Sequence, residues 1–182
     1  MDNSNNAVHA RVVQLFRDMG AELFAPYRFH YDRSTEAEPA ILEDECFMSV
    51  LSASAEGIKI LCYIRFATDV GEFIFNGDKE HRSVEQIRDL CGELNNQLVG
   101  KVKNRLLAFK CRLVLGLPTH LSGKKLAASC STQAVVATHS YSSGAGNLDV
   151  VVHTIIHDEF AMSGEPDESL VGAVEEGTLA FF

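Results

Sequence analysis

Two segments of the chain place apolar residues at the spacing of an amphipathic helix. The first covers residues 6–19 and is followed by Gly20, where a C-terminal helix cap is expected. The second begins at Ser83, which forms a capping-box pattern with Gln86, and continues without proline to about Phe109. Its apolar positions return to one face, at Ile87, Leu90, Cys91, Leu94, Leu98 and Val102. The pattern therefore predicts a long helix over residues 83–109 with one side packed against the rest of the protein.

The remaining apolar runs are typical of strands. The predicted strands cover residues 46–54, 58–66, 112–117, 133–140 and 148–156. A hairpin is predicted around residues 55–57, and a flexible turn at 142–147. Residues 25–45 are predicted to be mostly loop, and residues 67–81 fit either a strand or a short helix. The sequence shows no internal repeat, so we expect one α+β domain: an antiparallel or mixed sheet with the long helices packed on one face.

The charge of the chain argues against two classes of partner. The formal net charge of -9 repels phosphate backbones and anionic lipid, so neither nucleic acid nor a membrane is an expected partner. The last 22 positions contain acidic residues but no Lys or Arg. We therefore expect a domain over residues 1–160 and a peripheral acidic segment over 161–182. A basic cluster between residues 101 and 112 is interpreted as a solvated helix face in preference to a docking patch.

The cysteines and the N-terminus indicate the cellular compartment. Five cysteines are dispersed without CxxC spacing, which is typical of buried free thiols in a reducing environment. The first six residues are polar and lack the pattern of a signal peptide. No apolar run approaches the ~18 residues of a membrane span. We expect a soluble cytoplasmic protein.

The predicted long helix carries a polar stripe. On a helical wheel, Glu93, Asn96, Gly100 and Lys103 cluster on the side opposite the apolar residues around Leu98. Gly100 is unusual here because glycine inside a helix costs roughly 1 kcal/mol relative to alanine. Close approach of a partner to the helix backbone would explain it. A tolerated defect, or contact with another part of this chain, would explain it equally well.

Three other motifs are better explained by structural roles than by metal binding, catalysis or phosphate binding. His153 and His157 match HxxxH, but on a predicted strand their side chains would lie ~13 Å apart, too far for one metal ion. Cys91 faces the core by periodicity. Residues 142–146 lack the residue order of a phosphate-binding loop and are predicted to form a turn. No metal site is predicted.

The segments at residues 93–103 and 117–123 resemble the CheX/CheC/FliY family of chemotaxis phosphatases. The family signature is E-x-x-N on a long helix, a glycine four residues further on, and then a strand ending in a Pro-Thr turn. Glu93, Asn96 and Gly100 match the helix positions, and Pro118 with Thr119 matches the turn. The resemblance is clear over residues 83–123 and looser over 6–66 and 130–157. A single E-x-x-N favours the single-site CheX-like branch.

The resemblance implies a phosphatase that hydrolyses the aspartyl phosphate of a CheY-like receiver domain. Asn96 would orient the attacking water, and Glu93 would pair with a lysine that the receiver presents. Gly100 and Lys103 are predicted to contact the partner. No cofactor of the phosphatase itself is implied, because the receiver holds the Mg²⁺. Relatives of this branch pair through their sheets, so a homodimer is expected. Two alternatives stay open: a non-catalytic receiver-binding adaptor, and a structural component of a signalling complex.

Overall fold

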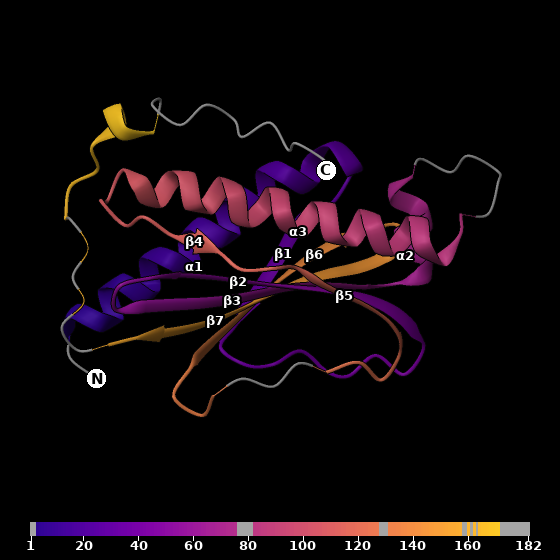
Figure 1. Ribbon diagram of the computed structural model, residues 1–182. Coiled ribbons are helices and arrows are strands. Elements are labelled where there is room, and N and C mark those ends of the chain that lie inside the picture. The colour runs from indigo at the N-terminus through magenta and orange to yellow at the C-terminus, as the bar shows by residue number, and fades with distance from the viewer. Residues whose placement is uncertain are drawn as a thin grey trace.

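The computed structural model is an antiparallel sheet with two long helices on one face (Figure 1). It describes residues 3–75, 82–127, 131–157, 160, 162 and 164–171. The helices are α1 (Asn3–Phe24), α2 (Thr68–Ile74) and α3 (Val84–Leu107), with 3-10 turns η1 (Ala25–Tyr27) and η2 (Glu168–Leu170). The strands are β1 (His30–Thr35), β2 (Glu45–Ala55), β3 (Ile58–Ala67), β4 (Val114–Leu115), β5 (Thr119–Lys124), β6 (Val135–Ser143) and β7 (Gly146–Ile156). The predicted α+β class, with helices on one face of the sheet, is confirmed.

The long predicted helix forms as expected and is α3. Ser83 Oγ accepts a hydrogen bond from the Gln86 N–H at 3.3 Å, and Gln86 Oε1 accepts one from the Ser83 N–H at 2.9 Å. This capping box satisfies two backbone donors at the start of the helix. Leu94 and Leu98 are almost fully buried on the sheet side, which confirms the apolar face. Only the end differs, because the helix stops at Leu107 and not at Phe109.

The prediction that Gly20 ends the first helix is wrong. Helix α1 continues to Phe24, and a 3-10 turn containing Pro26 follows it. Gly20 serves packing instead, because a Cβ atom there would lie 2.2 Å from the hydroxyl of Tyr141. That hydroxyl donates to the carbonyl of Arg17 at 2.9 Å. The glycine therefore lets α1 lie close to β6.

The strand predictions hold for the two long hairpins and fail at the edges of the sheet. Hairpins β2–β3 and β6–β7 form around short turns. The turn between β2 and β3 contains Gly57, which has a φ of 78°. Residues 25–45 contain β1, although they were predicted to be mostly loop, and β5 forms where a turn was predicted. The strand predicted over 112–117 shortens to β4. Residues 67–81 were predicted to form either a strand or a short helix, and the structure shows helix α2 there. Residues 76–81 lie outside the described residues.

The order of strands interleaves two halves of the chain. The sheet runs β1-β6-β7-β3-β2-β4, and β5 also pairs with β2. The first half of the chain contains α1 followed by β1, β2 and β3, and the second half contains α3 followed by β5, β6 and β7. The first strand of each half pairs with a strand of the other half: β1 pairs with β6, and β5 pairs with β2. The fold thus repeats an order of elements that the sequence itself does not reveal. Because each half completes the sheet of the other, both belong to one folding unit.

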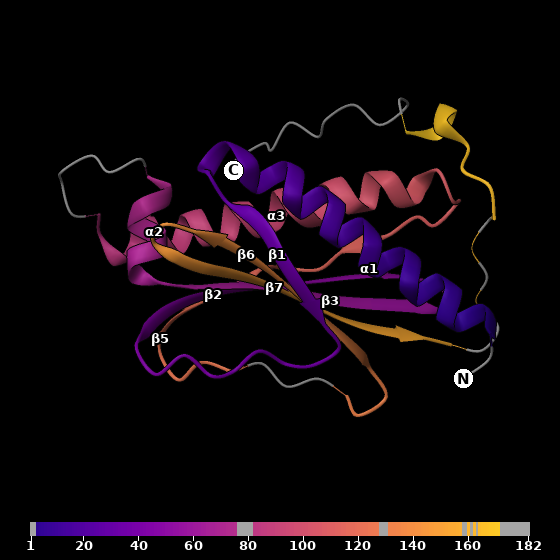
Figure 2. The same ribbon diagram turned by 180° about the vertical axis from the view of Figure 1, so that it is seen from behind.

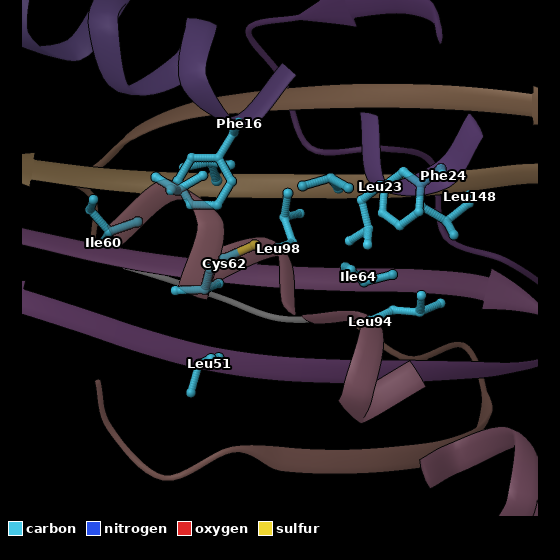
Figure 3. Close-up of a cluster of buried hydrophobic side chains, with 14 of the residues drawn as sticks. Phe16, Leu23, Phe24, Leu51, Ile60, Cys62, Ile64, Leu94, Leu98 and Leu148 are labelled. Atoms are coloured by element: carbon cyan, nitrogen blue, oxygen red, sulfur yellow. The ribbon is translucent and has the colours of Figure 1, made fainter. Parts of the chain in front are cut away.

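The main core lies between the sheet and the two helices, which run in opposite directions over it (Figure 2). Figure 3 shows side chains of α1 (Phe16, Leu23, Phe24) meeting those of α3 (Leu94, Leu98) above the strands. The opposite face carries a small apolar cluster of Met48, Tyr63 and Val151. It also carries a buried ion pair between Arg65 and Asp149 at 3.0 Å. One face of the sheet is therefore mainly apolar, and the other mixes apolar and polar contacts.

Part of the acidic C-terminal segment contacts the end of α3. The Asp167 N–H donates to the carbonyl of Ala108 at 2.8 Å. Glu168 lies 3.7 Å from the guanidinium of Arg105, and both side chains are largely exposed. The 161–182 segment was predicted to be peripheral, and most of it lies outside the described residues. Of its described residues, Met162 packs against the main core, and residues 164–169 are exposed.

Candidate functional site

The four predicted site residues lie along the outward side of α3. Glu93 is exposed, and Asn96, Gly100 and Lys103 are partly exposed. All four are on the side of the helix turned away from the core. Residues three and four apart are neighbours on a helix surface, so Glu93 and Asn96 can meet a partner at the same time. The structure thus brings the four residues together, and their individual roles stay predictions.

Of two adjacent asparagines, only Asn96 is available to a partner. Asn95 is fully buried, and its side-chain amide donates to the carbonyls of Ser49 at 2.8 Å and of Cys62 at 3.4 Å. Asn95 therefore ties α3 to β2 and β3. Its position on the helical wheel, beside the apolar stripe, is the signal in the sequence that separates it from Asn96.

The carboxylate of Glu93 has a partner on its own helix. Gln97 Nε2 donates to Glu93 Oε1 at 2.8 Å, one turn further along α3. Such exposed pairs contribute only about 0.2–0.5 kcal/mol, so a stronger partner can displace the glutamine. The bond holds Glu93 on the outer surface while leaving it accessible.

Gly100 adjoins open space. A Cβ atom built there meets no described atom within 4 Å beyond the adjoining helix backbone. Contact with another described part of this chain is therefore not the reason for a glycine at this position. The two remaining explanations are close approach by a partner and a tolerated defect.

The basic residues near the stripe differ in their surroundings. Lys101 Nζ forms an ion pair with Glu22 Oε1 of α1 at 2.7 Å, and the guanidinium of Arg105 lies near the carboxylate of Glu168. Lys103, within the described part of the chain, forms no ion pair. Among these three basic residues, Lys103 is thus the one left for an anionic partner.

His120 borders the stripe, although no sequence pattern predicts a role for it at the site. It lies on β5, and its ring covers Gly92, the residue just before Glu93. Its Nδ1 lies 3.2 Å from Ser49 Oγ. The contact depends on the pairing of β5 with β2, so periodicity along α3 does not predict it.

The candidate site lies on the outward surface of α3. Four clefts, of about 790, 730, 620 and 290 Å³, are lined entirely by other residues. The largest lies between α1 and the β1–β6 edge and includes His139, whose burial lowers its pKa to about 4. Small substrates are usually bound in concave sites. An outward-facing helix stripe suits a macromolecular partner instead.

The HxxxH histidines have separate surroundings. His153 is buried on β7, with Nε2 lying 2.8 Å from a carboxylate oxygen of Glu38. Burial lowers the pKa of His153, and the Glu38 carboxylate opposes that shift. His157 follows the end of β7, and its backbone N–H donates to Gly57. Among the described residues, no three His, Cys, Asp or Glu side chains are grouped to hold a metal ion. Cys91 is fully buried, as its periodicity predicted.

Comparison with solved structures identifies the fold. The chemotaxis protein CheX from Vibrio vulnificus matches with a TM-score of 0.69 and 16% identity, over 79% of this chain and 99% of that one. A CheC-like superfamily protein from Shewanella sp. PV-4 matches with a TM-score of 0.69 and 18% identity, over 85% and 99%. CheX in the CheX–CheY–BeF3–Mg+2 complex from Borrelia burgdorferi matches with a TM-score of 0.61 and 13% identity, over 79% and 97%.

These matches define the class of fold: the chain has the fold of CheX and CheC-like chemotaxis proteins. No family model and no curated protein matches the sequence. In the described residues, no helix is both long and apolar enough to cross a membrane.

Proposed function

We propose that this protein hydrolyses the aspartyl phosphate of a CheY-like receiver domain. The observation that carries the proposal is the outward-facing pair Glu93 and Asn96 on α3, next to the bare backbone of Gly100, in a CheX-like fold. The solved complex of a CheX with CheY supports a receiver as the partner.

The chemistry needs little beyond positioning. In an acyl phosphate, water attacks phosphorus in line with the bond to the aspartyl oxygen, and that bond breaks to give phosphate and a free carboxylate. The Mg²⁺ of the receiver stabilises the developing charge. What a second protein can add is a fixed position for the water. A side-chain amide donates and accepts hydrogen bonds without changing its protonation, so Asn96 suits this role.

Glu93 and Lys103 would orient the partner. A fixed anion one turn from Asn96 can pair with a lysine of the receiver and so align α3 over the phosphoryl group. Lys103 adds a positive charge further along the same stripe. Gly100 lets the receiver surface approach the helix backbone, because no side chain stands between them.

The proposal is tested by measuring phosphate release from an acyl-phosphorylated CheY-like receiver with and without this protein. Release well above the receiver's own rate supports catalysis. Absence of acceleration, together with retention of the phosphorylated receiver in a pull-down, would identify a receiver-binding adaptor instead. Absence of both would leave a structural role.

Gly100 provides a test of docking. Gly100→Ala and Gly100→Leu should each raise the free energy of unfolding, by up to about 1 kcal/mol, because helix propensity improves. Only leucine projects far beyond the helix, so Gly100→Leu should weaken receiver binding by at least about tenfold, or 1.4 kcal/mol, while Gly100→Ala weakens it less. Calorimetric titration with the receiver and thermal unfolding measure the two effects. Full affinity of Gly100→Leu would show that the receiver does not approach here.

We also propose that the protein is a homodimer. Strand β1 lies at one edge of the sheet, and all six of its residues are exposed. Open strand edges are usually covered or protected, and a second copy would cover this one. Light scattering should therefore give about twice the 20.0 kDa mass of one chain. A monomer mass at micromolar concentration would contradict the dimer without affecting the phosphatase proposal.

A further inference from the structure

His120 fills the space that a side chain at position 92 would need. A Cβ atom placed on Gly92 would lie 2.3 Å from Cε1, 2.7 Å from Nδ1 and 2.9 Å from Nε2 of the His120 ring. Real Cβ atoms essentially never come so close to another heavy atom. Gly92 is buried and directly precedes Glu93. Helix α3 and strand β5 therefore meet through an imidazole ring lying on bare helix backbone.

A chain of hydrogen bonds continues from this contact into the core. Asn95 Nδ2 donates to the Ser49 carbonyl at 2.8 Å and approaches Ser49 Oγ at 3.3 Å. Because Ser49 Oγ accepts from Asn95, its own proton can be donated to His120 Nδ1, 3.2 Å away. Ser49 is fully buried on β2. Asn95, Ser49 and His120 thus join α3, β2 and β5 beside the turn of α3 that carries Glu93 and Asn96.

We propose that His120 is a positioning residue of the candidate site. Its ring on Gly92 and its bond to Ser49 fix the turn of α3 from which Asn96 projects. The inference rests on the proposed function. The proposed reaction depends on where Asn96 holds the attacking water, and a displacement of about 1 Å in a positioned group can lower a rate by as much as 10²-fold. A residue that fixes this turn of α3 therefore affects the rate. On the other flank of α3, the Lys101–Glu22 pair is largely exposed, and pairs of that kind constrain a helix weakly.

Four variants separate the two contacts of the ring. His120→Ala removes both contacts. His120→Phe keeps a ring over Gly92 without the bond to Ser49, and His120→Asn keeps hydrogen-bonding atoms without the ring. Gly92→Ala disrupts the same contact from the helix side, because the added methyl group displaces the ring. Leu121→Ala is the matched control, because Leu121 is the next residue of β5 and pairs in register with Met48, which packs on the opposite face of the sheet.

The measurements are single-turnover dephosphorylation of a saturating complex, receiver affinity, and thermal unfolding. We expect His120→Ala and Gly92→Ala to lower the rate constant within the complex on the order of tenfold, with affinity changed by less than about twofold, since misplacement affects the reaction more than docking. His120→Phe and His120→Asn should lie between His120→Ala and the parent. Leu121→Ala should match the parent.

Three results would overturn the inference while leaving the proposed function intact. The first is an unchanged rate constant in His120→Ala and Gly92→Ala with an active parent. The second is a loss that disappears at a temperature where the variants are fully folded, which indicates a purely structural role. The third is a loss confined to affinity, which would make His120 a docking residue. An inactive parent would overturn the proposed function itself, and this inference with it.

Discussion

Replacement of Asn96 by alanine is expected to lower the rate of receiver dephosphorylation by on the order of 10²-fold, the usual effect of losing one preorganised polar group. Affinity for the phosphorylated receiver should change little, because the proposed role of Asn96 is to orient water and not to hold the partner. Asn96 is partly exposed and outside the core, so its truncation should also leave the fold intact. Phosphate release under saturating and limiting receiver measures the two quantities separately.

Two further variants sharpen this prediction. Asn104→Ala removes the same side chain from the same helix two turns further on, and it should behave as the parent. Glu93→Ala should weaken both binding and rate, because Glu93 is proposed to pair with a lysine of the receiver. Equal activity of Asn96→Ala and an active parent would eliminate the proposed mechanism. Equal phenotypes for Glu93→Ala and Asn96→Ala would show that the two residues do not have the separate roles assigned to them.

The features that could be predicted from the sequence are those set by local pattern. Ser83 and Gln86 mark the start of α3, and its apolar periodicity determines which side faces the sheet. For that reason the sequence alone predicts that one outward stripe carries Glu93, Asn96, Gly100 and Lys103. Hairpins β2–β3 and β6–β7 also follow from local signals, because each joins two apolar runs through a short turn.

The features that could not be predicted depend on contacts between distant segments. Strand β1 has no apolar alternation and exists because it pairs with β6, more than one hundred residues later in the chain. Gly20 resembles a helix cap in sequence, but it serves the contact between α1 and Tyr141. His120 reaches Gly92 only because β5 is held beside β2. Periodicity carries no information on such pairings, so the neighbours of a predicted stripe are less predictable than the stripe.

The buried polar contacts on the other face of the sheet are another consequence of distant pairing. Asp149 on β7 accepts hydrogen bonds from Arg65 of β3 at 3.0 Å and from Ser140 of β6 at 2.8 Å. Arg65 also donates to the carbonyl of Ala40 at 2.5 Å. The side chain of Arg65 is 4% exposed and that of Asp149 is 14% exposed. This pair therefore links three strands and the β1–β2 connection in a setting where a lone charge is poorly solvated.

Asp149→Ala should lower the free energy of unfolding by about 3–5 kcal/mol, because it leaves the Arg65 guanidinium buried without its counter-ion. That loss is a large share of the 5–15 kcal/mol typical of a folded domain, so the variant should unfold at much lower denaturant concentration. Glu22→Ala is the matched control: it also breaks a carboxylate–cation pair, but the exposed Glu22–Lys101 pair should contribute only about 0–1 kcal/mol. Replacing both members, as in the double variant Arg65→Met/Asp149→Leu, should recover much of the loss, since an apolar pair leaves no buried charge. Equal unfolding midpoints for Asp149→Ala and Glu22→Ala in urea would show that solvent reaches Arg65 and that the pair contributes no more than a surface one.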